Sequence, residues 1–257
     1  MGPLVLPLMK PLTNFFRPLL SLGAFMGIWS LASLFFEPYV LPSPLEIVED
    51  FDHLYTPDLL DHLRITLLRV IAGFMVSFAA GTSMGILGHV LKITPWVEGA
   101  MMMVQVIPGV ILGVILLLLV GQGSEVPVML IIVLTTPLIA MNTGAALARR
   151  NPSMEGVILS FGGTRRHLVK DLYLPMLVPA MRSNAGIGMA MAVKVVVLGE
   201  FIATDNGLGY LINMARIYFN MADVLFYVMI ILVLILGFQL MIDAVFFFFL
   251  KKYFYPG

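Results

Sequence analysis

The sequence lacks cysteine and is poor in charged residues. With no cysteine among 257 residues, disulfide bonds, thiolate metal sites and a thiol nucleophile are excluded. Four scattered histidines do not supply a metal site either. Charged residues make up 12% of the chain and the net charge is zero, so no nucleic acid is expected as a partner. Hydrophobic residues reach 60%, far above the share in a soluble domain, and this indicates an integral membrane protein.

Motifs for catalysis and nucleotide binding are also missing. There is no GxxxxGK[ST] phosphate loop, so this chain is not expected to hydrolyse ATP itself. There is no HExxH or GxSxG motif either, and we expect no catalytic residue, no metal and no cofactor in this chain. Glycines four residues apart, at 81 and 85 and at 109 and 113, predict close packing between helices.

Long apolar stretches dominate the rest of the sequence. A helix that crosses about 30 Å of hydrocarbon needs roughly 20 residues. Six stretches meet that length, at approximately 19–36, 66–91, 97–120, 126–148, 178–202 and 224–250. We therefore predict an all-α membrane protein with about six transmembrane helices. It would form a single transmembrane domain over residues 1–257, with a core from about 60 to 250. Pro108 and Pro137 fall inside the third and fourth stretches and are candidate kinks.

Lys and Arg are distributed unequally between the two sides of these spans. Eleven lie on the side that carries both termini, three lie on the other side, and Lys194 falls inside a span. Because positive residues are retained in the cytoplasm, both termini are predicted to be cytoplasmic in a multi-pass protein of the cell inner (plasma) membrane. The three on the outer side are Arg64, Arg69 and Arg216. The outer segment 37–64 is expected to contain a short interfacial helix in LEIVEDFDHLY, residues 45–55.

The longest polar segment on the cytoplasmic side is Asn151 to Pro175, NPSMEGVILSFGGTRRHLVKDLYLP. It predicts a short amphipathic helix or a helix-turn-helix broken at Gly162-Gly163, with its charges facing solvent. Pro175 and Pro179 would end this element and begin the next span. The apolar residues expected to pack are Leu159, Phe161, Leu168, Leu172 and Leu174. The length indicates an ordered docking element, and an ordinary connection between two spans is the plainer interpretation.

This segment and several others resemble one transporter family. Gly162, nine intervening residues, Leu172 and then Leu174-Pro175 have the spacing of the EAA loop in permease subunits of ATP-binding-cassette (ABC) importers. Four further segments resemble the nitrate, sulfonate, taurine and bicarbonate branch: LPSP at 41–44, TLLRVIAGF at 66–74, IPG at 107–109 and GEFIATDNGLGYLI at 199–212. One departure stands out. The family's acidic position falls on Gly156, and Glu155 lies one residue earlier, about 100° around a helix.

The resemblance implies the type I ABC importer permease fold, with a cytoplasmic coupling loop at about 149–177 docking on a separate ABC ATPase subunit that binds ATP and Mg. The coupling positions would be Glu155, Gly156, Gly162, Gly163, Thr164, Arg165, Leu172, Leu174 and Pro175. The resemblance also implies a second permease copy in a homodimer, a solute-binding protein outside, membrane lipid around the spans, and import of a small anion such as nitrate, sulfonate, taurine or bicarbonate. A self-sufficient secondary transporter or channel subunit is the alternative, for which no internal repeat is evident.

Polar residues inside the spans are candidates for the translocation pathway. An intramembrane charge costs about 2.5–3.5 kcal/mol on insertion scales and needs a partner or a wet cavity. Lys194 is the foremost candidate: its ammonium would attract an anion, and a structural ion pair with an acid elsewhere is an equally good interpretation. The other candidates are Gln105, Thr135, Asn142 and Glu200. Hydroxyl and amide groups also hydrogen-bond between helices without touching a substrate.

Overall fold

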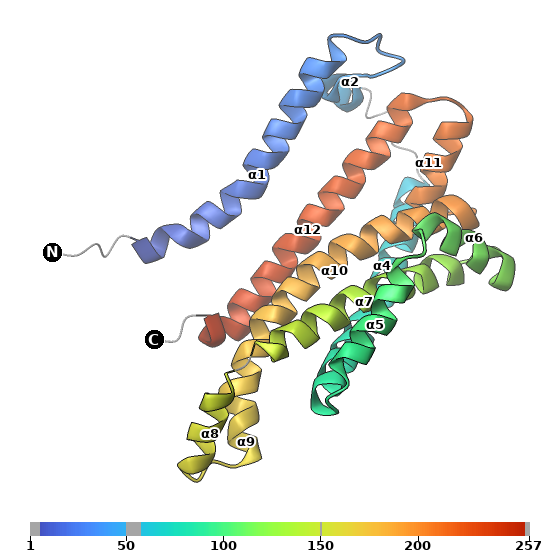
Figure 1. Ribbon diagram of the computed structural model, residues 1–257. Coiled ribbons are helices and arrows are strands. Elements are labelled where there is room, and N and C mark those ends of the chain that lie inside the picture. The colour runs from blue at the N-terminus through green and yellow to red at the C-terminus, as the bar shows by residue number, and fades with distance from the viewer. Residues whose placement is uncertain (1–5, 50–57, 150, 255–257) are drawn as a thin grey trace. The chain divides into compact units, whose positions relative to one another are not determined.

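A computed structural model describes residues 6–49, 58–149 and 151–254, and every regular element in these ranges is a helix (Figure 1). Contacts divide the chain into two compact units. The first comprises Met1–Leu59 and Ile212–Leu232, and the second comprises Leu60–Leu211 and Val233–Gly257. The all-α fold predicted from the sequence is confirmed.

The first unit contains α1 (Leu6–Ser33) and α2 (Pro44–Glu49), together with parts of α11 (Leu208–Ile217) and α12 (Met221–Phe254). The indole Nε1 of Trp29 donates to the carbonyl of Pro42 at 3.0 Å, which fixes the chain between α1 and α2. Ser43 and Glu46 exchange side-chain to backbone hydrogen bonds of 2.6 and 3.2 Å, a capping box that starts α2. The predicted helix at 45–55 therefore exists in its first part, and residues 50–55 lie outside the described residues.

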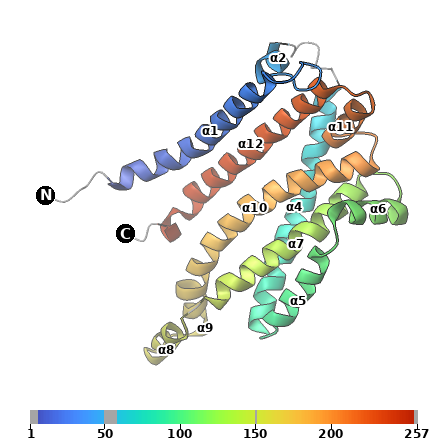
Figure 2. The ribbon, with the colours of Figure 1, turned by 45° about the horizontal axis from the view of Figure 1, so that its top comes forward.

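The second unit is built around two long helices, α7 (Glu125–Ala148) and α10 (Leu174–Ala203), which lie side by side in both ribbon views (Figures 1 and 2). Helices α5 (Thr94–Gln105) and α6 (Gly109–Val120) pack against α7, and α6 also contacts α10. The amide of Asn184 on α10 donates to Thr143 on α7 at 3.0 Å, which is the interhelical use expected for such groups.

Helix α4 (Leu59–Val90) approaches α7 closely through glycines. A Cβ at Gly81 would lie 2.8 Å from the carbonyl oxygen of Thr136, and one at Gly85 would lie 2.6 Å from Cβ of Thr143. Side chains at these positions would force the two helices apart. The packing role predicted for the spaced glycines is confirmed here, and also on α6, where Gly113 faces Ile202 of α10.

The number of spans differs from the prediction. Among the described residues, four helical stretches are long and apolar enough to cross a membrane. About six were predicted; the predicted first span, 19–36, lies on α1, where Leu20–Ser33 is a shorter apolar helix among the described residues. The four stretches are Leu59–Val90, Glu125–Ala148, Arg165–Ala203 and Met221–Phe248.

The predicted third span, 97–120, is not a single helix. It consists of α5 and α6, which meet at an angle of 83° across Val106 to Pro108 and together make at most a fifth span. Pro108 lacks a backbone N–H and disfavours the helical conformation of the residue before it, so the helix ends there. Each half has 12 residues, or about 18 Å, which is too short to cross 30 Å of hydrocarbon alone. In contrast, Pro137 does not interrupt α7.

The predicted helix boundary at Pro175 is also wrong. Helix α9 (Arg165–His167), the π-helix η1 (Leu168–Tyr173) and α10 follow one another without a break. Since Pro175 has no N–H to bond the carbonyl four residues earlier, a regular α-turn cannot form across it. The wider π-turns absorb this defect, and the N–H of Leu174 donates to Val169, five residues back. Pro179 likewise lies inside α10.

Candidate functional site

The polar segment forms a helical hairpin at the start of α10. Helix α8 (Pro152–Ser160) begins at Asn151, whose side chain accepts a 3.0 Å hydrogen bond from the N–H of Ser153. The turn after α8 requires Gly162, which has φ of +79°, and the N–H of Gly163 donates to the carbonyl of Ile158 at 2.9 Å. Thr164 then caps α9, and its N–H donates to Nδ1 of His167 at 3.0 Å. The helix-turn-helix predicted around Gly162-Gly163 is confirmed.

Glu155 fastens the two arms of this hairpin together. The hydroxyl of Tyr173 on η1 donates to Oε1 of Glu155 at 2.8 Å, and Leu172 is buried beside it. The shift of the acid by one residue therefore turns its carboxylate toward η1. Gly156 is exposed, and a Cβ there would touch nothing within 4 Å. The family's acidic position is thus an open place on the surface of α8.

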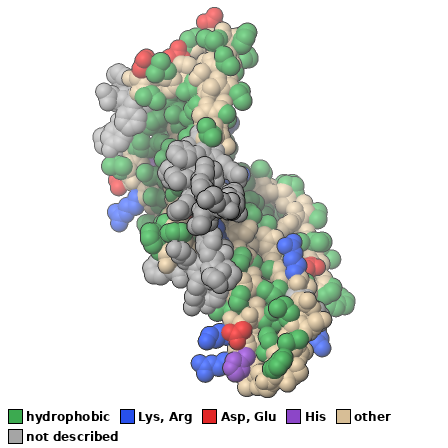
Figure 3. Space-filling model, turned by 90° about the vertical axis from the view of Figure 1, so that its left-hand side faces the viewer, with side chains coloured by type: hydrophobic (Ala, Val, Ile, Leu, Met, Phe, Trp, Pro, Cys, Tyr) green, Lys and Arg blue, Asp and Glu red, His purple; other side chains and the backbone are tan. Residues whose placement is uncertain are grey.

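Apolar side chains of the hairpin are left exposed. Phe161 is 88% exposed and Leu159 is about half exposed, so these two of the five apolar residues expected to pack are not covered by this chain. Met154 and Val157 are also more than half exposed. Arg165, Arg166, His167 and Lys170 are exposed as well, and Figure 3 shows charged and histidine side chains gathered at the lower end, where the hairpin lies. The hairpin presents apolar and basic groups together.

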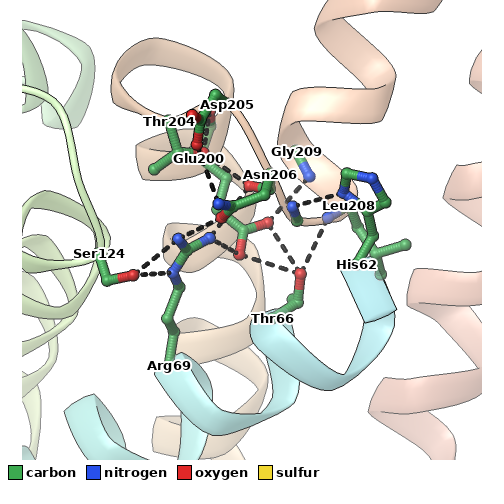
Figure 4. Close-up of polar contacts among 11 residues, drawn as sticks. His62, Thr66, Arg69, Ser124, Glu200, Thr204, Asp205, Asn206, Leu208 and Gly209 are labelled. Atoms are coloured by element: carbon green, nitrogen blue, oxygen red, sulfur yellow. Dashed lines mark hydrogen bonds and ion pairs between the residues drawn. The ribbon is translucent and has the colours of Figure 1, made fainter. Parts of the chain in front are cut away.

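A second cluster lies at the other end of α10, around Glu200 (Figure 4). The side chain of Glu200 is fully buried. Its carboxylate accepts hydrogen bonds of 2.9 Å from Nη1 of Arg69, from the hydroxyl of Thr66 and from the N–H of Gly209. Arg69, which is 4% exposed, forms an ion pair with it. This buried cluster, which we call the Glu200 lock, joins α4 to α10 and α11.

The guanidinium of Arg69 extends the Glu200 lock to two further segments. It donates to the hydroxyl of Ser124, which precedes α7, at 2.8 and 3.1 Å. It also donates to the backbone carbonyl of Asn206 at 3.1 Å and to that residue's side-chain oxygen. Thr66 in turn accepts from the N–H of Leu208 at 2.9 Å. With its charge and hydrogen bonds satisfied, Arg69 can remain buried.

Two glycines make the chain after α10 fit over Glu200. Gly207 has φ of +98°, and a Cβ there would collide with the Glu200 carboxylate. A Cβ at Gly209 would lie 2.6 Å from Cβ of Glu200. The GEFIATDNGLGYLI block therefore contains both the buried acid, Glu200, and the loop that folds over its side chain.

Sequence reasoning missed the α4 half of this cluster. Arg69 was counted among the outer cations, yet the structure buries it inside α4. The usable signal was its spacing from Thr66: three residues apart on a helix, two polar side chains share one face of an otherwise apolar span.

The five pathway candidates do not converge on one place. Thr135 and Glu200 are fully buried, Asn142 is half-buried, and Gln105 and Lys194 are exposed. Lys194 belongs to a stripe along α10 that also exposes Pro179, Ser183 and Ile187. Among the described residues, Lys194 forms no hydrogen bond or ion pair. The nearby intramembrane acids are engaged: Glu200 pairs with Arg69, and Asp243 pairs with Arg182 at 2.9 Å.

Both clusters fall within a region that matches a known family. The family of binding-protein-dependent transport system inner membrane components matches residues 63–254. The chain belongs to this family. It is a multi-pass permease subunit of an ABC importer in the inner membrane, as the sequence predicted. The family match favours this function over the self-sufficient transporter considered as the alternative.

Individual relatives of this permease cover most of its length. It is 29% identical over 196 residues to the formylaminopyrimidine transport permease protein ThiX of Halalkalibacterium halodurans, covering 76% of this chain and 78% of that protein. It is 28% identical to the riboflavin transport system permease protein RibX of Chloroflexus aurantiacus (71% and 69% covered). It is 24% identical to the putative aliphatic sulfonates transport permease protein SsuC of Bacillus subtilis (69% and 65% covered).

A solved structure shares the fold of the permease. An inward-facing structure of the MetNI methionine ABC transporter superposes with a TM-score of 0.63 at 21% identity, covering 73% of this chain and 94% of that chain. The type I importer permease fold predicted from the sequence is thereby confirmed. Family and fold together imply an ATPase partner and a permease dimer.

Proposed function

We propose that this permease works as a homodimer that imports a small anion delivered by a solute-binding protein, with the α8–α9 hairpin docked on a separate ABC ATPase in the cytoplasm. The exposed ammonium of Lys194, which has no ion-pair partner among the described residues, is the observation that carries the choice of an anion. The ATPase supplies ATP and Mg binding, and this chain supplies the membrane pathway.

The hairpin has the properties of a docking element. It exposes Phe161 and Leu159 beside basic residues, a combination that is costly to leave in water without a partner. The Glu155–Tyr173 hydrogen bond and the turn at Gly162 hold it in one shape before any partner binds. A preorganised element loses less entropy on binding, which favours a stable interface.

Charge accounting supports the role of Lys194. Arg69 and Arg182 have carboxylate partners in this chain, whereas the ammonium of Lys194 has none among the described residues. In a homodimer, Glu200 and Asp243 of the second copy would be paired in the same way. A solute anion passing along the exposed stripe of α10 would supply a countercharge for Lys194.

The names of the relatives do not decide the substrate. They refer to a formylaminopyrimidine, riboflavin and aliphatic sulfonates, so the substrate differs within the family. The anion assignment therefore rests on Lys194, and nitrate, sulfonates, taurine and bicarbonate are the first compounds to test.

The experiment is uptake by the complete complex in proteoliposomes, comparing the wild type with Lys194→Met and Lys194→Arg. We expect Lys194→Met to lose at least tenfold of the ATP-dependent uptake of whichever anion is transported, and Lys194→Arg to retain part of it. Lys92→Gln removes a positive charge from the exposed turn between α4 and α5 and should leave uptake unchanged. Unaltered uptake by correctly assembled Lys194→Met would refute the pathway role.

A further inference from the structure

A histidine holds the loop that closes over the Glu200 lock. His62, near the start of α4, accepts a hydrogen bond through Nδ1 from the backbone N–H of Gly207 at 2.8 Å (Figure 4). The imidazole also stacks on the ring of Tyr210, with ring centroids 5.9 Å apart and planes 11° from parallel. The ring is partly exposed, so protons can reach it.

This contact requires the neutral form of the imidazole. Nδ1 can accept a hydrogen bond only when it carries no hydrogen itself, so the hydrogen of the neutral ring is on Nε2. A protonated ring has N–H groups at both nitrogens. Protonation would therefore replace the hydrogen bond with two N–H groups facing each other at 2.8 Å.

Among the described residues, no carboxylate pairs with His62. On its own helix the nearby charges are Asp58, Asp61 and Arg64, all exposed. From α10 comes Glu200, already paired with Arg69, and from the loop comes Asp205, which accepts from Asn206 at 2.9 Å. From α11 comes the Tyr210 ring. Within the described ranges, none of these acids forms an ion pair with His62.

The loop that His62 holds also supplies several of the contacts that complete the Glu200 lock. Immediately after Gly207, the N–H of Leu208 donates to Thr66 and the N–H of Gly209 donates to Glu200. Before it, Asn206 accepts from Arg69. Loss of the hydrogen bond between His62 and Gly207 therefore weakens the hold of the loop over the buried Arg69–Glu200 ion pair.

We propose that His62 is a proton-operated latch: protonation releases loop 204–209 from α4 and loosens the Glu200 lock. The latch is closed while the imidazole is neutral and opens when Nδ1 gains a proton. The latch lies at the end of α10 opposite the hairpin and would act whichever solute is carried.

Hydrogen–deuterium exchange on the complete complex in nanodiscs tests the latch, read from peptides within 201–211. The comparison is between pH 7.5 and pH 5.5, after correction for the pH dependence of unprotected amides. The decisive variant is His62→Asn, whose Oδ1 takes the place of Nδ1 and accepts at every pH. His62→Gln has no acceptor at that place and serves as the permanently open control.

Loss of one hydrogen bond of ordinary strength predicts roughly three- to tenfold faster exchange in the wild type at pH 5.5 than in His62→Asn, and equal exchange at pH 7.5. His62→Gln should exchange at the faster rate at both pH values. Equal exchange of wild type and His62→Asn at pH 5.5 overturns the proposal. If His62→Asn does not assemble, the wild type alone decides, because corrected exchange that does not change with pH also overturns it.

Discussion

Replacing Glu200 with Gln would leave Arg69 charged and buried with no carboxylate partner. Gln retains a carbonyl that can accept from Gly209, but it cannot balance a guanidinium that is only 4% exposed. The substitution therefore removes the negative charge of the Glu200 lock while keeping a side chain of nearly the same shape.

The expected cost follows from the burial of both partners. Removing one member of a buried ion pair costs about 3–5 kcal/mol, because the other charge stays buried and uncompensated. For a chain of this size, 1 kcal/mol corresponds to roughly 2–4 °C in melting temperature. We therefore expect Glu200→Gln to lower the melting temperature of the permease by about 6–20 °C.

The assay is thermal unfolding of the permease in lipid nanodiscs, followed by the fluorescence of its two tryptophans. Three variants form a double-mutant cycle: Glu200→Gln, Arg69→Met and the two combined. Because the double variant contains no unpaired charge, it should melt above the value obtained by adding the two single losses. Lys92→Gln, an exposed substitution, should shift the melting temperature by less than about 2 °C.

The reasoning fails if Glu200→Gln melts within about 2 °C of the wild type. It also fails if the two single losses are simply additive, because additivity would mean that Glu200 and Arg69 contribute independently.

Two further predictions concern the hairpin and the helix packing. Phe161→Ser should reduce the amount of ATPase that co-purifies with the permease by roughly tenfold, because a large apolar contact is lost. Phe219→Ser changes an equally exposed ring elsewhere and should have no effect. Equal recovery of ATPase with both variants would argue against docking through the hairpin. Gly85→Ala should melt below Gly237→Ala by the equivalent of about 1–3 kcal/mol, because a Cβ at Gly85 meets Thr143 whereas one at Gly237 meets nothing within 4 Å. Identical melting of these two variants would contradict the close approach of α4 to α7.

The sequence predicted features that depend on local chemistry. Apolar length located α4, α7, α10 and α12, and Gly162-Gly163 located the turn of the hairpin, because a positive φ strongly favours glycine. The four-residue spacing of Gly81 and Gly85 on α4 predicted that this helix packs closely against another. Each of these signals lies within one stretch of sequence.

What the sequence could not predict depends on contacts between distant segments. Glu200 and Arg69 are 131 residues apart, and no local pattern shows that the acid on α10 neutralises the cation on α4. Tyr173 and Glu155 meet only because the hairpin folds back on itself. The bend at Pro108 and the continuity across Pro175 show the same residue type with opposite outcomes, decided by whether neighbouring turns can rearrange.

The unbroken helix from Arg165 to Ala203 makes the permease sensitive to small rotations. Its 39 residues correspond to a rod of about 58 Å, with the hairpin near one end and Glu200 near the other. A rod of that length tilted by about 5° around one end carries the opposite end through roughly 5 Å, close to the pitch of one helical turn. The π-turns before Pro175 keep the rod continuous where a proline would otherwise have divided it. Because the rod is continuous, any tilt about a point between its ends moves the hairpin end and the Glu200 end together, in opposite directions.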